Sequence, residues 1–203
     1  MAVNYQVHAE VIDVRADQPR SSDALLVDSN VWLWMYYPGP GASADWRSQV
    51  YPNYVKRARR AKAKLLRCGL SLCELAHQIE LAEFELFQQT HPNERAKEFR
   101  HNYPVERRSV ATSLLAAWRI IKTMAVPLGL TVDDRATDAA MAAFESRLLD
   151  GYDLLFVQAM SAAGVNQVLT DDGDYCTVPG IQVFTANRQV IEASRAQGKL
   201  LTR

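Results

Sequence analysis

The sequence predicts an α/β protein of three layers, in which a central parallel β-sheet lies between two layers of helices. Short apolar runs of strand length alternate with longer segments of helical periodicity, and this alternation is typical of parallel sheets that are covered on both faces. Two of the apolar runs, at residues 25–27 and 165–169, end abruptly at polar and acidic residues. The chain of 203 residues is long enough to bury one sizeable core.

The strands are expected where short apolar runs meet turn residues. Residues 1–23 are predicted to be an N-terminal extension or arm, in which residues 7–14 are a candidate edge strand. Residues 24–203 are predicted to form one domain with a basic helical insertion at about 46–67. Residues 38–45 are rich in Pro and Gly and are expected to be a loop. The domain's strands are expected at 24–28, 130–132, 166–170 and 181–185.

The helices are recognised by their apolar spacing and by their end signals. Apolar residues at helical spacing indicate one buried face between Glu74 and Gln89. Residues 69–72 are either a short strand or the entry to this helix. Gly164 stands at a C-cap position after a helix at 152–163. The other helices are expected at 46–66, 105–124, 134–149 and 187–197.

Composition restricts the class of protein. Hydrophobic residues make up 48% of the chain and charged residues 23%, which is ordinary for a globular protein. The three cysteines form no Cys-x-x-Cys motif, so a reducing cytoplasm is the expected compartment. The first twenty residues include five charged ones and no apolar core, so no signal peptide is expected. No apolar stretch is long enough for a membrane span, and no membrane partner is predicted.

Charge is distributed unevenly, although the net charge is zero. Nine acidic and two basic residues lie between 131 and 175, whereas the segment 56–67 holds seven basic residues and no acid. The basic run is either a solvated helix face or a surface that binds a nucleic-acid backbone. The candidate nucleic-acid-binding residues are Lys56, Arg57, Arg59, Arg60, Lys62, Lys64 and Arg67.

Acidic residues follow two of the predicted strands directly. Asp28 follows the first strand of the domain, and Asp171, Asp172 and Asp174 follow the strand at 166–170. In open α/β sheets, sites lie at the carboxyl ends of the strands. Crowded carboxylates repel one another and destabilise the fold unless a cation is bound. A hard divalent ion, Mg²⁺ or Mn²⁺, is therefore the expected cofactor.

Two further acids stand in apolar surroundings between these strands. Glu74 lies in the segment 71–76, and Asp153 opens the helix at 152–163. Four separated acids, each next to apolar residues, suggest one shared acidic pocket.

Four motifs resemble those of the PIN-domain nucleases and occur in the order of that family. Residues 27–31, Val-Asp-Ser-Asn-Val, resemble its opening motif, and residues 169–175 resemble its late Thr-x-Asp-x-Asp-aromatic motif. Glu74 matches the mid-chain glutamate, and Asp153 matches the third acidic position. The resemblance covers about residues 24–186, and size and layout are most similar to those of VapC-type toxin ribonucleases.

The resemblance implies a PIN-like fold and a metal-dependent endoribonuclease that leaves a 5′-phosphate. Asp171 occupies the variable position of the late motif and is expected to be exposed to solvent. RNA is the implied substrate, and an antitoxin protein and a second copy of the chain are candidate partners. The implied catalytic metal ligands are Asp28, Glu74, Asp153 and Asp172, with Asp174 as a further ligand. The implied supporting residues are Ser29, Asn30 and Thr170.

Several of these residues have ordinary structural interpretations. Asp28 could cap a helix. Asp150 is a rival of Asp153 for the third acidic position, because one of the two could simply cap the helix that starts near residues 151–152. Ser29 could serve a turn, and Thr170 could simply end its strand. The alternative function is a noncatalytic PIN-like module that binds RNA or a protein.

Other constellations are weaker. Glu74 and His77 have the Glu-x-x-His spacing of di-iron bundles, but the chain has no second such motif. Cys68, Cys73 and His77 would form an incomplete zinc site with nonstandard spacing. The aromatic segment 32–37 could stack on bases, but core or subunit contacts are the preferred interpretation.

Overall fold

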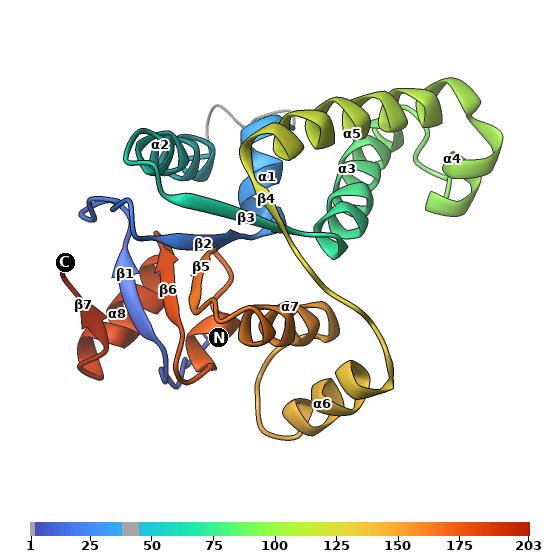
Figure 1. The fold of residues 1–203 in the computed structure, drawn as a ribbon. Coiled ribbons are helices and arrows are strands. Elements are labelled where there is room, and N and C mark those ends of the chain that lie inside the picture. The colour runs from blue at the N-terminus through green and yellow to red at the C-terminus, as the bar shows by residue number, and fades with distance from the viewer. Residues whose placement is uncertain (1–2, 38–44) are drawn as a thin grey trace.

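The computed structural model describes residues 3–37 and 45–203, which form one parallel sheet with the strand order β4-β3-β2-β5-β6-β1-β7 (Figure 1). Every strand pairing in it is parallel. The α/β class and the parallel sheet are therefore confirmed. The strands are β1 (Glu10–Asp13), β2 (Ala24–Val27), β3 (Lys64–Cys68), β4 (Val126–Leu128), β5 (Gln167–Leu169), β6 (Gln182–Thr185) and β7 (Leu200–Leu201).

Helices cover both faces of the sheet, as predicted (Figure 1). Because side chains alternate along a strand, Leu25 and Val27 of β2 pack with the first helical layer and Leu26 packs with the second. The first layer comprises α1 (Ser29–Tyr36), α2 (Arg47–Arg60), α3 (Leu70–Gln88), α4 (Ala96–Asn102) and α5 (Pro104–Met124). The second comprises α6 (Asp134–Phe144), α7 (Gly151–Ala162) and α8 (Arg188–Ala196).

The strand order reverses direction at β2. The chain proceeds from β2 to β3 and β4 on one side, whereas β5 and β6 lie on the other side. β2 therefore pairs with both β3 and β5. This is the topological switch point, where open α/β sheets form a crevice outside the carboxyl ends of their strands.

The N-terminal segment belongs to the same sheet. Residues 10–13 form β1, which pairs with β6 on one side and β7 on the other. The candidate edge strand at 7–14 is thus a strand with two neighbours, because residues 200–201 add β7 outside it. None of the helices in the described segments combines the length and the apolar character that a membrane span requires.

Three predicted elements differ from those observed. The helix expected over 134–149 ends at Phe144 as α6. The helix expected over 46–66 ends at Arg60, and residues 64–68 are β3. Lys62 adopts a positive φ of 63°, which breaks the helix, and pairing with β2 then buries Leu65 and Leu66. Local helix propensity of the Ala-, Lys- and Arg-rich run is overridden here by burial in the sheet.

The strand expected at 130–132 is also wrong, because its place beside β3 is taken by residues 126–128. The segment 69–72 is helical, since α3 begins at Leu70. The predicted loop at 38–45 lies, apart from Asp45, outside the described residues.

Candidate functional site

Asp28 stands at the junction of β2 and α1, where its carboxylate accepts four hydrogen bonds. Oδ1 accepts from the backbone N–H of Ser29 at 2.6 Å and from its hydroxyl at 3.3 Å. Oδ2 accepts from Nδ2 of Asn30 at 2.7 Å and from the Thr170 hydroxyl at 2.5 Å. Asp28 is the N-cap of α1, as its alternative interpretation held, and it is also oriented by all three supporting residues.

These donors do not offset the burial of Asp28. Desolvation and the charge of Asp172 raise its pKa, the hydrogen bonds of Thr170 and Ser29 lower it, and the net pKa is about 6. A carboxylate with four donors would ordinarily have a depressed pKa. Burial therefore outweighs the four donors in setting the pKa of Asp28.

Glu74 lies near the start of α3, where the charges of Asp28, Asp150 and Asp172 act on it. Burial and the charges of Asp28, Asp150 and Asp172 raise its pKa, a hydrogen bond with Ser29 lowers it, and the net pKa is about 7. Its Oε2 atom is buried and has no hydrogen-bond partner among the described residues. A buried carboxylate oxygen without a donor is costly, and protonation, a water molecule or a cation would each remove this cost.

Asp153 enters the site from the first turn of α7. It is buried, and its Oδ1 accepts a hydrogen bond of 2.7 Å from the hydroxyl of Tyr175. Burial and then the charge of Asp28 raise its pKa to about 8. The competing residue Asp150 caps α7 by accepting from the N–H groups of Tyr152 and Asp153 at 2.9 and 3.0 Å. Asp153 is thus left to face the cluster.

The acidic loop after β5 is organised by its own hydrogen bonds. The N–H of Asp172 donates to the Thr170 hydroxyl, and the N–H of Asp174 donates to Oδ1 of Asp172, both at 2.9 Å. Burial raises the pKa of Asp172 and that of Asp174. Thr170 therefore connects Asp28 to the loop that carries Asp172.

Asp171 is not exposed, contrary to expectation. Its side chain is only 11% accessible, and Oδ2 accepts a hydrogen bond of 2.7 Å from Nε of Arg47. Oδ1 accepts from the hydroxyl of Tyr51 at 2.6 Å. The variable position of the motif is thus occupied by a residue that fixes α2 against the acidic loop.

Taken together, Asp28, Glu74, Asp153 and Asp172 share one electrostatic environment. The charge of Asp172 raises the pKa of each of the other three acids, and that of Asp28 raises those of Glu74 and Asp153. In residues 3–37 and 45–203, no three acidic, histidine or cysteine side chains are arranged to hold a metal ion as they stand. The oxygen donor set and the partnerless Oε2 of Glu74 would suit a hard cation only if side chains rotated to bring the carboxylates together.

The N-terminal segment supports the acidic loop. The backbone N–H groups of His8 and Ala9 donate to the carbonyl of Cys176 at 2.8 and 3.0 Å. The ring of Tyr5 lies so close to Gly173 that a Cβ atom there would overlap with it. Gly173 separates Asp172 from Asp174, so the N-terminal segment packs on the acidic loop between these two acids.

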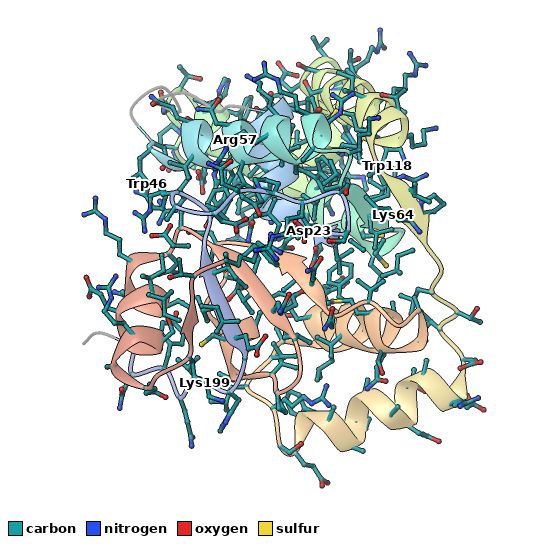
Figure 2. All side chains as sticks on the ribbon, turned by 60° about the vertical axis from the view of Figure 1, so that its left-hand side comes forward. Asp23, Trp46, Arg57, Lys64, Trp118 and Lys199 are labelled. Carbon is teal, nitrogen blue, oxygen red and sulfur yellow. The ribbon has the colours of Figure 1, made fainter. Side chains whose placement is uncertain are left out.

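The basic run is separated from the acids by the height of the sheet. α2 begins beside Asp171, whereas its last turn leads to Lys64, whose strand starts opposite Ala24 at the amino ends of the strands. A helix of 14 residues is about 21 Å long. Figure 2 places Trp46 and Lys64 on opposite sides of the view. Arg57 instead donates to the carbonyls of Val14 and Asp17.

The weaker constellations are not assembled. Cys73 and His77 are exposed, whereas Cys68 is buried in the second core layer. Trp32 is fully buried, as the core interpretation of the aromatic segment expects.

Sequence reasoning missed Arg47, Tyr51 and Tyr175 as neighbours of the acids. Tyr175 was visible as the aromatic residue of the late motif, but its partner Asp153 lies on another element. Arg47 and Tyr51 carry no motif and could be found only from the packing of α2.

Comparison of this chain with protein-family models, with curated proteins and with solved structures found no match.

Proposed function

We propose that this chain is a divalent-metal-dependent endoribonuclease with a PIN-like fold. The observation that carries the proposal is the electrostatic coupling of four carboxylates, which stand after β2, on α3, on α7 and in the loop after β5, around the switch point of the sheet. Their mutual repulsion is unfavourable unless a cation is present. Acidic residues clustered at this edge of the sheet can hold the cation that metal-assisted phosphodiester hydrolysis requires.

Each residue has a defined task in this proposal. Asp28, Glu74, Asp153 and Asp172 would hold Mg²⁺ or Mn²⁺, and Asp174 would add charge at the rim. When bound, the cation would lower the pKa of water and neutralise the charge that develops on the phosphate. Thr170 and Asn30 keep the Asp28 carboxylate in one orientation, and Tyr175 does the same for Asp153. Water attacks phosphorus, and the bond to the 3′-oxygen breaks.

A noncatalytic module that binds RNA or a protein is the second candidate. One observation favours it: Asp28 already accepts four hydrogen bonds, so protein donors can satisfy this carboxylate without a cation. The partnerless Oε2 of Glu74 and the raised pKa values of the acids favour the first candidate instead.

The test is cleavage of a mixed panel of RNAs with Mg²⁺, with Mn²⁺ and with EDTA, alongside calorimetric titration of Mn²⁺. Asp28→Asn should abolish cleavage and weaken Mn²⁺ binding, and EDTA should stop the wild type. Asp138→Asn is a matched control, because Asp138 is exposed on α6. A wild type that neither cleaves RNA nor binds Mn²⁺ would exclude the nuclease and favour the noncatalytic module.

The resemblance to VapC-type toxins extends the proposal to the biological setting. Expression of the active chain should arrest growth, and a small partner protein should relieve the arrest. A homodimer is a further prediction, to be tested by light scattering. Growth arrest by Asp28→Asn as strong as that by the wild type would separate toxicity from nuclease chemistry.

A further inference from the structure

Arg47 is the basic residue that the structure holds against the acidic loop. Its Nε–H donates to Oδ2 of Asp171 at 2.7 Å, and Nη1 lies 3.4 Å from Oδ1 of Asp45. Asp171 lies between Thr170, which bonds Asp28, and Asp172. The guanidinium is therefore connected to the candidate metal ligands through a single residue.

Two indole rings frame this guanidinium. Its Cζ atom lies 4.9 Å from the ring centroid of Trp46 and 5.9 Å from that of Trp34. The ring of Trp34 stacks on Tyr51 at 5.2 Å, and the Tyr51 hydroxyl bonds Asp171. The planar cation is thus held in place by rings and by carboxylates before any ligand arrives, which reduces the entropic cost of binding.

This cluster is accessible. The side chain of Arg47 is 39% exposed and Trp46 is 38% exposed. Figure 2 shows Trp46 at the side of the molecule, next to the helix that carries Arg57. The hydrogen bonds of the Arg47 side chain to described residues use Nε and Nη1, so Nη2 can donate to a ligand.

The chemistry of these groups suits one ligand. A negatively charged strand is repelled by the acids, so a cation beside them provides the nearest attachment point for a phosphate. An exposed indole next to that cation offers a stacking surface for a base. Bases can reach such a surface only when they are unpaired, which selects single-stranded segments over duplex. In the basic run, Arg57 lies over the ring of Tyr54, which is fully buried, and Arg67 lies over the ring of Trp118, which is half-buried. Neither ring is as exposed as that of Trp46.

We propose that Arg47 and Trp46 form a binding subsite for single-stranded RNA next to the acidic cluster. The guanidinium contacts a phosphate, and the indole stacks on the adjoining base. The inference rests on the proposed function for its choice of ligand, but it concerns binding and requires no metal.

The experiment measures fluorescence anisotropy of a short, unstructured, labelled oligoribonucleotide with the full chain in EDTA. Arg47→Ala and Trp46→Ala should each weaken binding about tenfold, which corresponds to the loss of one stacked base. Arg119→Ala is the matched control, because it removes the same charge from an exposed position on α5; its effect should stay within about twofold. Arg47→Lys should bind more tightly than Arg47→Ala but less tightly than the wild type, since lysine keeps the charge but lacks the planar guanidinium.

Circular dichroism and thermal melting check that each variant folds, and Trp46→Phe provides a milder change that keeps a stacking ring. Equal losses for Arg47→Ala and Arg119→Ala would mean diffuse electrostatic binding and would overturn the subsite. So would a duplex that binds as tightly as the single strand, or a wild type that binds no oligonucleotide. The binding assay contains no metal, so it does not depend on cleavage. If the chain binds RNA through Arg47 but fails to cleave it with Mg²⁺ or Mn²⁺, the nuclease proposal is overturned and the subsite stands.

Discussion

The hydroxyl of Thr170 donates a hydrogen bond of 2.5 Å to Oδ2 of Asp28 across the switch point of the sheet. The two residues follow neighbouring strands, since Val27 of β2 is opposite Leu169 of β5. The same hydroxyl accepts from the N–H of Asp172. One side chain thus sets the positions of two candidate metal ligands that are far apart in the sequence.

Thr170→Val should test this link. Valine keeps the shape but leaves the buried carboxylate of Asp28 and the N–H of Asp172 each without one partner. We expect a loss of about 1–3 kcal/mol in the free energy of unfolding, measured by urea denaturation, together with weaker Mn²⁺ binding. Thr112→Val is the control, because Thr112 is exposed on α5. Equal stability of the two variants would contradict the link.

Divalent metal should stabilise the fold. The acids repel one another without it, and an ion that binds only the native state adds about 2.7 kcal/mol at one hundred times its dissociation constant. The melting temperature of the wild type should therefore rise with Mn²⁺ and fall back with EDTA. Glu74→Gln should remove most of this rise, because it replaces the oxygen that lacks a partner. If Mn²⁺ raises the melting temperature of Glu74→Gln as much as that of the wild type, the ion binds at another place.

Gly173 and Tyr5 should be energetically coupled. Gly173→Ala should displace the Tyr5 ring and destabilise the protein, whereas in a Tyr5→Ala background the same change should cost nothing. The double-mutant cycle should give a coupling of about 1 kcal/mol by urea denaturation. Gly129→Ala is the control, since an added Cβ meets no atom within 4 Å there. The same cost of Gly173→Ala in both backgrounds would refute the contact.

Arg203 should contribute strongly to stability. Its guanidinium donates to the carboxylates of Asp17 and Asp23, whose side chains are only 1% and 2% accessible. Arg203→Ala would leave both acids buried without their cation, and we expect a loss of about 3–5 kcal/mol in urea denaturation. Arg195→Ala, an exposed change on α8, should be nearly neutral. Similar effects of the two substitutions would rule out the buried cluster.

The same cluster predicts a dependence on pH. Burial raises the pKa of Asp23, but the hydrogen bonds of Arg203 and of the Arg20 N–H lower it, and the net pKa lies below its ordinary value of 3.8. A carboxyl with a depressed folded pKa adds stability above its unfolded pKa, and this stability is lost as pH falls through the folded pKa. The wild type should therefore lose stability below about pH 4. Arg203→Ala should lose less over that range, as urea midpoints at several pH values will show.

Much of the fold could be predicted because it depends on local pattern. The strands β2, β5 and β6 are short apolar runs bounded by turn residues, and Asp150 and Gly164 mark the ends of α7. The wrong predictions arise where local helix propensity competes with burial against residues that are distant in the sequence. Residues 64–68 have good helix propensity, but in β3 they bury Leu65 and Leu66 between β2 and β4.

What the sequence by itself determined is the type of each chemical group and the strand end at which it stands. An apolar run followed by an acid places that acid at the carboxyl edge of a parallel sheet, so Asp28 and Asp172 were predictable from order alone. Tertiary structure decided which partners these acids meet. Arg47 reaches Asp171, while the richer basic run of residues 56–67 leads to the other edge, because α2 spans the height of the sheet. Likewise, Tyr175 meets Asp153 only because η1 (Asp174–Thr177) packs against α7, a contact that no local pattern encodes.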